Sequence, residues 1–236
     1  MSNPYFRFKQ FTTYHDRCAM KVGTDGVLLG AWCDVTGCRE IVDAGTGSGL
    51  IALMLAQRGG ANITGVEIDA AAAAQAAENA ALSPFAERVK IVCASFADFA
   101  AESEGKYDRV VSNPPYFIDS LKPGNAARSL ARHTGTMDYR QLVANSCRLL
   151  SESGRLAVIL PYDHFDFFAG VADEYHLSLC RKTVVYPKPD AVPRRVLMEW
   201  GKTPCSCVDD TLVVEVERHI YSDDFKRLTQ EFYLDK

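Results

Sequence analysis

Apolar and polar positions follow two alternating periods along the chain, and the alternation predicts a sheet with helices between its strands. Short apolar runs recur between Glu40 and Leu160, and segments with helical spacing separate them. This rhythm is typical of parallel strands joined by crossover helices. The predicted strands are Glu40–Asp43, Asn62–Glu67, Val89–Cys93, Tyr107–Ser112 and Gly154–Leu160. The predicted helices are Gly49–Gln57, Ala70–Ala81, Phe96–Ala100 and Tyr139–Leu150, the last with Asp138 as its N-cap.

The flanking segments extend this α/β core. Phe6–Thr12 alternates like a strand, and Thr24 is placed to cap a helix through Val27–Trp32. After Pro161 the pattern predicts a helix at Tyr162–Asp173, strands at Leu177–Tyr186, Arg195–Trp200 and Thr211–Glu217, and a last helix begun by Ser222. We therefore expect one domain over 1–236, with an N-terminal extension (1–35), a doubly wound sheet core (36–202) and a C-terminal strand and helix (203–236).

Composition places the chain among globular proteins. Hydrophobic residues make up 47% and charged residues 24% of the sequence, and no apolar run approaches the ~20 residues that span a bilayer. The first residues lack the basic start and apolar stretch of a secretory signal. We expect a cytoplasmic protein that binds no membrane and acts as a monomer.

The eight cysteines lie at 18, 33, 38, 93, 147, 180, 205 and 207, without the paired spacing of a zinc site. Intracellular cysteines are usually reduced, so we expect free thiols and no metal site. The formal charge of −4 does not indicate a nucleic-acid-binding protein, because such proteins usually carry a basic surface. An RNA substrate would require basic residues concentrated in one place.

A glycine-rich turn follows the first predicted strand of the sheet core. Asp43 ends that strand, and Gly45, Gly47 and Gly49 follow at alternate positions before a helix begins. Glycines let the backbone turn sharply and approach a ligand closely. A dinucleotide fold uses G-x-G-x-x-G to hold a pyrophosphate, which an acidic residue at the strand end would repel. Asp43 suits a ligand with an ammonium group, as in S-adenosylmethionine, and we interpret the turn as a site for that cofactor.

Two further strand ends carry polar side chains. Glu67 ends the second strand, where nucleotide-binding folds place a carboxylate for the ribose hydroxyls. Asp69, just beyond it, fits a helix N-cap better than a ligand contact. After the third strand, either Ser95 or Asp98 could meet the adenine of the cofactor, and the residues alone do not choose between them.

The tetrapeptide Asn113-Pro114-Pro115-Tyr116 directly follows the fourth strand, which places it at the carboxyl end of the sheet beside the cofactor turn. The prolines stiffen the turn and remove N–H donors, so it presents the Asn113 side-chain oxygen and the Pro114 carbonyl as acceptors. Two acceptors binding the N–H groups of a flat amide or amino nitrogen would favour a pyramidal nitrogen with a free lone pair. Tyr116 would stack on the flat acceptor. We predict methyl transfer to such a nitrogen, without a metal.

These motifs resemble the class I methyltransferases of the N6-adenine and glutamine-N5 type, which share a D-x-G-x-G-x-G turn and an NPPY loop. Within that group the chain is similar to the bacterial tRNA adenine-N6 methyltransferase family, whose members act on adenine 37 of a valine tRNA. The similarity covers nearly the whole chain. It is carried by Phe6–Phe11, His15–Gly26, Leu28–Trp32, Asn113–Tyr116, Ala131–His133 and Tyr221–Phe225.

The resemblance implies a Rossmann-like class I methyltransferase fold, with a mostly parallel seven-stranded sheet and an N-terminal strand and helix extension. It also implies that the N-terminal segment closes over the cofactor, with Lys21, Thr24, Asp25 and Asn113 among its contacts. Ser95 departs from the family pattern, in which an Asp commonly contacts the cofactor adenine.

A tRNA substrate needs a local basic surface to hold the phosphates of the anticodon stem-loop. Arg128, Arg132 and His133 border the predicted loop Ile118–Thr136, and Arg194 and Arg195, with Lys182 and Lys188 near them, surround Pro187–Pro193. Two alternatives remain at this point. The chain could methylate a glutamine N5 in a protein such as a release factor, although such enzymes usually bear an N-terminal helical domain. It could also be a catalytically silent S-adenosylmethionine-binding module, which would have no need for the NPPY residues.

Overall fold

The structure is a computed structural model that describes residues 3–103, 105–115 and 137–234. Its central sheet contains β3 (Glu40–Ala44), β4 (Asn62–Glu67), β5 (Val89–Cys93), β6 (Tyr107–Ser112), β7 (Leu150–Pro161), β8 (Ser178–Tyr186), β9 (Arg195–Gly201) and β10 (Val208–Val213). The helices are α1 (Thr24–Trp32), α2 (Leu50–Arg58), α3 (Ala70–Ala81), α4 (Phe96–Ala101), α6 (Tyr139–Leu149), α7 (Phe165–Glu174) and α8 (Asp223–Thr229). Two hairpins, β1 (Tyr5–Arg7) with β2 (Thr12–Tyr14) and β11 (Glu215–Glu217) with β12 (Ile220–Tyr221), lie outside the sheet.

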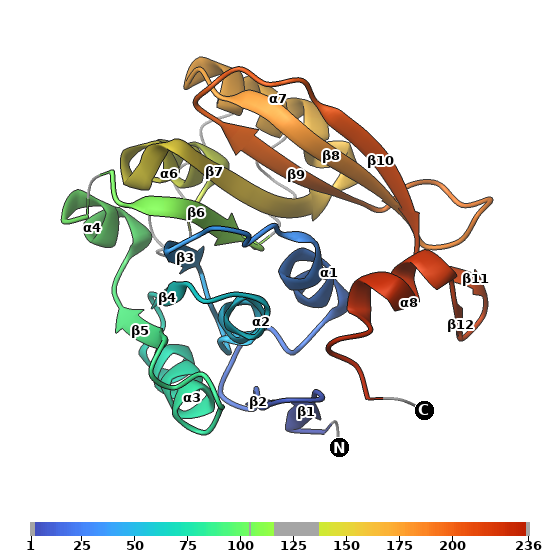
Figure 1. The fold of residues 1–236 in the computed structure, drawn as a ribbon, viewed down its shortest axis with the longest axis horizontal. Coiled ribbons are helices and arrows are strands. Elements are labelled where there is room, and N and C mark those ends of the chain that lie inside the picture. Colours follow the sequence, from blue (N-terminus) through green and yellow to red (C-terminus); the bar gives the residue numbers. More distant parts are fainter. Residues whose placement is uncertain (1–2, 104, 116–136, 235–236) are drawn as a thin grey trace.

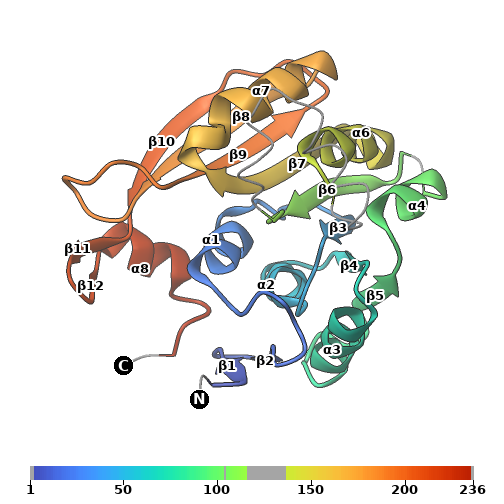
Figure 2. The same ribbon diagram turned by 180° about the vertical axis from the view of Figure 1, so that it is seen from behind.

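The sheet has the strand order β10-β8-β9-β7-β6-β3-β4-β5. Helices cover both of its faces (Figure 1 and Figure 2). One apolar cluster joins α1, α2 and α8 to the sheet, and a second joins α4, α6 and α7. The predicted doubly wound α/β fold is therefore confirmed. The strand order reverses between β3 and β6, which is where folds of this kind bind ligands.

The sheet has eight strands instead of the predicted seven. Strands β3 to β7 are parallel, β9 runs antiparallel between β7 and β8, and β10 adds an eighth strand parallel to β8. The predicted strand Thr211–Glu217 divides into β10, which begins earlier at Val208 and pairs with β8 up to Val213, and β11, which pairs with β12 outside the sheet.

Side-chain caps set the beginnings of three helices as the sequence predicts. Asp138 accepts from the backbone N–H of Gln141 at the start of α6, and Asp69 accepts from Ala72 at the start of α3. Ser222 caps α8 in the same way. The predicted cap at Thr24 is wrong, since α1 begins at Thr24 itself and Gly23 occupies the cap position without a side-chain bond.

The N-terminal segment forms a hairpin instead of one strand over Phe6–Thr12. Phe8 and Phe11 are buried, with their ring centroids 4.8 Å apart, and the Phe8 N–H donates to the Phe11 carbonyl. The alternating pattern predicted one continuous strand. Burial of this aromatic pair instead bends the chain between β1 and β2.

The expectation of free thiols is wrong for two cysteines. Cys180 of β8 and Cys205 form a disulfide, with their Cα atoms 5.4 Å apart, a separation usual for such bonds. The two cysteines meet because the end of β9 lies beside Cys180. A Cβ built on Gly201 would lie 3.4 Å from the Cys180 sulfur, and Cys205 follows four residues later. Sequence spacing gives no sign of this contact.

A search of the described ranges for helices of membrane-spanning length and apolarity finds none. The same ranges contain no cluster of three or more His, Cys, Asp or Glu side chains arranged to hold a metal ion.

Candidate active site

The carboxyl end of the sheet, where β3, β4 and β6 all terminate, brings the predicted cofactor turn and the proline turn together. Asp43 pairs in register with Val111 of β6, and the Ser112 hydroxyl donates to the Ala44 carbonyl at 2.8 Å. Both atoms are buried. Because Asn113 is the next residue after Ser112, this bond fixes the start of the proline turn beside the glycine-rich turn.

The glycine-rich turn has a backbone that L side chains rarely adopt. Gly45, Gly47 and Gly49 have φ values of +72°, +55° and +81°. A Cβ built on Gly45 or Gly47 would meet no atom within 4 Å. The amides of Gly45 and Thr46 both donate to the Val66 carbonyl, at 2.9 and 3.1 Å, which fastens the turn to β4. The turn is thus fixed in place, with open space beside two of its glycines.

Asp43 is completely buried beneath this turn. Its Oδ2 accepts from the Thr46 hydroxyl at 2.6 Å and from the Ala52 amide at 3.1 Å, so it holds the turn against the first turn of α2. Its Oδ1 has no hydrogen-bond partner among the described residues. Burial, opposed by the two hydrogen bonds, raises the pKa of Asp43 to about 7. A nearby cation would favour the ionised form of this carboxyl.

Glu67 ties the turn to the next strand end. Its Oε2 accepts from the Gly47 amide at 2.9 Å and its Oε1 from the Asp69 amide at 3.0 Å. The side chain is half-buried, so the carboxylate borders solvent above the turn. Ile68, which the sequence analysis did not select, follows with 53% of its side chain exposed. A carboxylate and an exposed apolar side chain at this place suit a nucleoside, which has polar hydroxyls and a flat apolar base.

Ser95 and Asp98 bind each other at the start of α4. The Ser95 oxygen accepts from the Asp98 amide at 3.1 Å and its hydroxyl donates to the Asp98 carboxylate at 2.7 Å. The Ala94 amide donates to the Glu67 carbonyl, so this pair lies one strand from Glu67. Either side chain stays a candidate for the cofactor adenine.

The acceptor turn is described only up to its second proline. Asn113 is half-buried and Pro114 is buried. Four of the predicted site residues, Tyr116, Arg128, Arg132 and His133, lie outside the described residues, as does the predicted loop Ile118–Thr136.

Two residues predicted for different roles form an ion pair. Arg195, assigned above to the substrate, donates from Nε to the Asp25 carboxylate at 2.8 Å. Asp25 lies in the first turn of α1, and a Cβ on the following Gly26 would come within 2.9 Å of Leu50, next to Gly49. The pair therefore joins the start of β9 to the helix that flanks the cofactor turn. Lys21 and Thr24 are exposed just before it.

Two of the basic residues around Pro187–Pro193 form ion pairs, and two are exposed to solvent. Lys182 pairs with Asp209 at 2.8 Å, and Arg195 is held by Asp25. Lys188 and Arg194 are exposed. The Arg194 carbonyl accepts from the Tyr162 amide just beyond β7, so Arg194 lies at the same end of the sheet as Asn113.

Two buried amides on α3, Gln75 and Asn79, are functional candidates that the sequence motifs did not indicate. Gln75 is 2% and Asn79 1% exposed. Their spacing of four residues in a helix that is otherwise mostly alanine was a usable signal, because such residues share one face. Asn79 donates to the Ser48 carbonyl within the cofactor turn at 2.8 Å.

A cavity of about 480 Å³ lies elsewhere, between the end of α1, β8, β10 and α8. It is lined by Trp32, Arg181 and Arg227 among others, and by none of the predicted site residues. The carboxyl end of the sheet is the better candidate for the active site, because Oδ1 of Asp43 has no hydrogen-bond partner there and Gly45 and Gly47 have open space beside them.

Comparison with known proteins identifies the family of the chain. The family described as "Methyltransferase small domain" matches residues 23–164. The chain is 48% identical over 235 residues to the tRNA1(Val) (adenine(37)-N6)-methyltransferase of Parabacteroides distasonis, covering 99% of both chains. It is 49% identical over 234 residues to the protein of that name from Phocaeicola vulgatus, again covering 99% of both.

A solved structure shows the same fold at low identity. The structure described as a predicted O-methyltransferase from Agrobacterium tumefaciens matches with a TM-score of 0.70 and 17% identity, covering 88% of this chain and 96% of that chain. At such identity the likeness concerns the fold alone.

Proposed function

The chain belongs to the methyltransferase small domain family, and from that premise we propose that it methylates N6 of an adenine in tRNA, at position 37 of a valine tRNA. The proposal also rests on the relatives' names and on their coverage of the whole chain. The observation that carries it is the Ser112 to Ala44 hydrogen bond, because it sets the acceptor turn beside the cofactor turn.

The cofactor is S-adenosylmethionine, and the residues at the carboxyl end of the sheet fit it. It supplies an electrophilic methyl group on a sulfonium sulfur. The orphaned Oδ1 of Asp43 is suited to the amino-acid part, which carries an ammonium group. The open space over Gly45 and Gly47 admits a ligand close to the backbone, and Glu67 offers carboxylate oxygens to ribose hydroxyls.

The acceptor turn would activate the adenine amino group by holding its protons. The nitrogen lone pair of an exocyclic amine is delocalised into the ring, which makes it a weak nucleophile. Acceptance of its two N–H bonds by the Asn113 side-chain oxygen and the Pro114 carbonyl favours a pyramidal nitrogen with the lone pair free. This preorganised pair acts where charge develops, and neither acceptor needs to be a strong base. Tyr116 would stack on the adenine ring.

The substrate surface would include Lys188 and Arg194, which are exposed at the same end of the sheet. Arg128, Arg132 and His133 are proposed to add to it on the sequence argument alone. Phosphate contacts of this kind position the anticodon loop without reading its sequence. An unpaired base in that loop can turn out into a pocket at a low cost in free energy, because no base pair has to be broken. We propose that the protein acts in the cytoplasm and as a monomer.

Labelled S-adenosylmethionine incubated with the protein and total tRNA, or with a release factor, tests the assignment. We expect label in N6-methyladenosine within a valine tRNA. Label only in protein glutamine would support the glutamine-N5 activity instead. Binding of the cofactor without any transfer, across both substrates, would indicate a silent binding module and overturn the proposal.

A further inference from the structure

The two buried amides of α3 hold the N-terminal segment against the cofactor turn. Gln75 and Asn79 lie one helical turn apart and face the chain that precedes α1. Buried polar groups are costly unless they are hydrogen-bonded, so their partners indicate why they are there.

Asn79 makes three hydrogen bonds. Its Oδ1 accepts from the Tyr14 amide at 3.0 Å, and its Nδ2 donates to the Tyr14 carbonyl and to the Ser48 carbonyl, both at 2.8 Å. One side chain thus bridges the end of β2 and the glycine-rich turn.

Gln75 fastens the next residues of the same segment. Its Oε1 accepts from the Arg17 amide at 3.0 Å and from the Cys18 thiol at 3.2 Å. Its Nε2 donates to the Asp16 carboxylate at 2.6 Å. An exposed ion pair between Arg17 and Glu78 adds little to this, because exposed pairs contribute little to stability.

The fastened segment lies near the polar groups proposed to bind the donor. Burial, followed by the charges of Glu67 and Asp69, raises the pKa of Cys18 to about 11, so Cys18 is within electrostatic reach of both carboxylates. Lys21 follows three residues later, and α1 begins at Thr24. The chain from Cys18 to Thr24 therefore runs between two fixed points, one on α3 and one at the start of α1.

We propose that Asn79 and Gln75 are positioning residues for S-adenosylmethionine: they hold residues 14–18 to the cofactor turn, so that the segment up to Thr24 borders the donor. The inference rests on the proposed donor site. It requires amides in particular, because each side chain must donate and accept at once. A carboxylate at position 79 would face the Tyr14 and Ser48 carbonyls and repel both.

The test uses Asn79→Asp and Gln75→Glu in the full-length protein, with Gln57→Glu as the matched control. Gln57 lies on the neighbouring helix α2 and donates its amide to the Glu231 carbonyl at 2.8 Å, away from residues 14–18. S-adenosylhomocysteine binding is measured by calorimetry, and KM for the donor and kcat are measured on tRNA. Trypsin cleavage after Arg17 and Lys21, with and without S-adenosylhomocysteine, reports whether the segment is held.

We expect Asn79→Asp to weaken S-adenosylhomocysteine binding and raise the donor KM by roughly tenfold, with kcat at saturating donor within about twofold. Trypsin should cut the variant faster, and S-adenosylhomocysteine should protect it less than the wild type. Gln75→Glu should shift the same quantities in the same direction, since its new carboxylate would face the Asp16 carboxylate to which Gln75 now donates. Gln57→Glu should resemble the wild type.

The outcomes separate this inference from the proposed function. Wild-type protein that fails to bind S-adenosylhomocysteine would contradict the proposed donor site itself. Wild-type binding together with unchanged affinity and unchanged cleavage in both α3 variants would overturn the positioning role. If Asn79→Asp does not fold, Gln75→Glu decides the matter by the same two measurements.

Discussion

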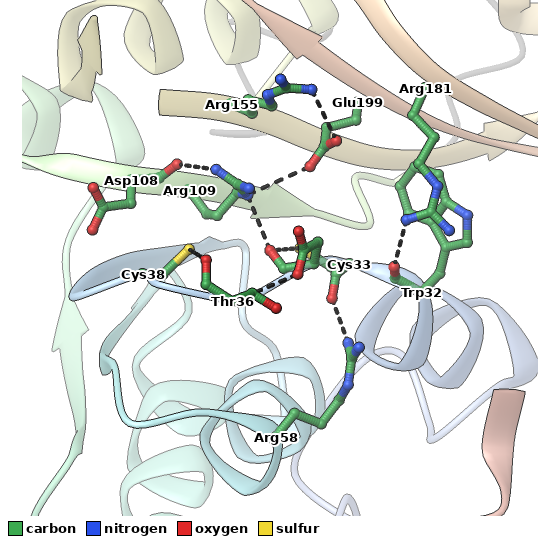
Figure 3. Close-up of polar contacts among 11 residues, drawn as sticks. Trp32, Cys33, Thr36, Cys38, Arg58, Asp108, Arg109, Arg155, Arg181 and Glu199 are labelled. Atoms are coloured by element: carbon green, nitrogen blue, oxygen red, sulfur yellow. Dashed lines mark hydrogen bonds and ion pairs between the residues drawn. The ribbon is translucent and has the colours of Figure 1, made fainter. Parts of the chain in front are cut away.

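The two ends of the same sheet carry charged side chains in opposite arrangements. At the amino end, Glu199 of β9 lies between Arg109 and Arg155, with each of its oxygens 3.4 Å from one guanidinium group (Figure 3). Arg109 also donates to the Asp34 and Asp108 carbonyls. At the carboxyl end, Asp43 is as deeply buried, yet it has no ion pair among the described residues, and its Oδ1 has no hydrogen bond there either. Glu199 Oε1 also lacks a hydrogen bond, but it has the Arg109 guanidinium beside it.

The contrast separates a carboxylate that is neutralised within the fold from one that the proposed function assigns to the donor. In the amino-end cluster the charged groups contact one another. Figure 3 also shows that Arg58 donates to the Cys33 carbonyl and Arg181 to the Trp32 carbonyl. The carboxyl end combines an incompletely satisfied carboxylate with left-handed glycines and open space. Features that cost stability often occur at functional sites, and at the carboxyl end an unpartnered carboxylate oxygen and three left-handed glycines lie side by side.

Replacement of the proposed catalytic amide should give the largest effect at the carboxyl end. We expect Asn113→Ala to lower kcat by about 10²–10³-fold or more, because it removes an acceptor that acts in the transition state. Cofactor affinity should stay within roughly tenfold of the wild type. Steady-state kinetics on tRNA and calorimetry with S-adenosylhomocysteine measure the two.

Asn62→Ala is the matched control, since Asn62 bonds the Glu40 carboxylate at the exposed amino end of β4. Normal turnover by Asn113→Ala would contradict the proposed chemistry.

Removing the charge of Glu199 from the amino-end cluster should instead lower the free energy of unfolding. Glu199→Gln leaves Arg109, whose side chain is 12% exposed, without its charged partner. Removal of one member of a buried ion pair costs about 3 kcal/mol in the free energy of unfolding. Urea denaturation should show this loss, while kcat and the donor KM of the folded fraction stay unchanged. A kinetic defect with unaltered stability would mean that the two ends are not separate.

Alanine substitution in the cofactor turn tests whether its open space receives the donor. Gly47→Ala should cost about 1–2 kcal/mol of stability because its φ is positive, and should weaken donor affinity by roughly tenfold because the new Cβ occupies the open space proposed for the donor. Gly37 has a φ of +71° and equally open surroundings but lies before β3 at the other end. Gly37→Ala should therefore lose similar stability and no donor affinity. Equal donor affinities in the two variants would argue against the open space beside Gly47 as the donor site.

The pH dependence of donor binding should report the raised pKa of Asp43. Since burial raises it to about 7, the folded protein holds this proton more tightly than the unfolded chain. Its stabilising contribution is present below the unfolded pKa and is lost as pH rises through about 7. An ammonium beside the carboxyl favours ionisation, so donor affinity should increase over the same range with release of a proton.

Calorimetry between pH 6 and 8 in two buffers of different ionisation enthalpy measures that proton. Asp43→Asn should abolish the pH dependence. A proton count unchanged by the substitution would exclude Asp43 as its source.

Reversal of charge at the two exposed cations should give a smaller, salt-dependent effect. Lys188→Glu with Arg194→Glu should weaken tRNA binding and reduce the salt slope by about one for each lost phosphate contact. Arg195 is left intact, because reversing it would also break its pair with Asp25. Lys106→Glu, at the amino end of β6, is the control. Binding and slope unaltered in the double variant would remove this surface from the proposal.

Local pattern alone determined much of the fold. Periodicity and capping residues gave β4, β5, β6 and α3 at the bounds the structure shows, because the strands are short apolar runs between polar segments and the helix has a capping residue at its start. The glycine spacing, Asp43 and Glu67 indicated the cofactor end, because strand ends in a parallel sheet meet at one place. Sequence spacing could show neither the Asp25 to Arg195 pair nor the Cys180 to Cys205 disulfide, whose members are distant along the chain.

The sequence by itself determined the family, the parallel core and the chemical groups available to the reaction, since these depend on residue type and short spacing. Only the tertiary structure decided which groups are already satisfied and which remain open. It placed the Glu199 carboxylate between two arginines, left Oδ1 of Asp43 with neither a hydrogen bond nor an ion pair among the described residues, and fastened the N-terminal segment to Gln75 and Asn79. The physical reason is that hydrogen-bond satisfaction and burial are properties of contacts between distant segments, which no local pattern contains.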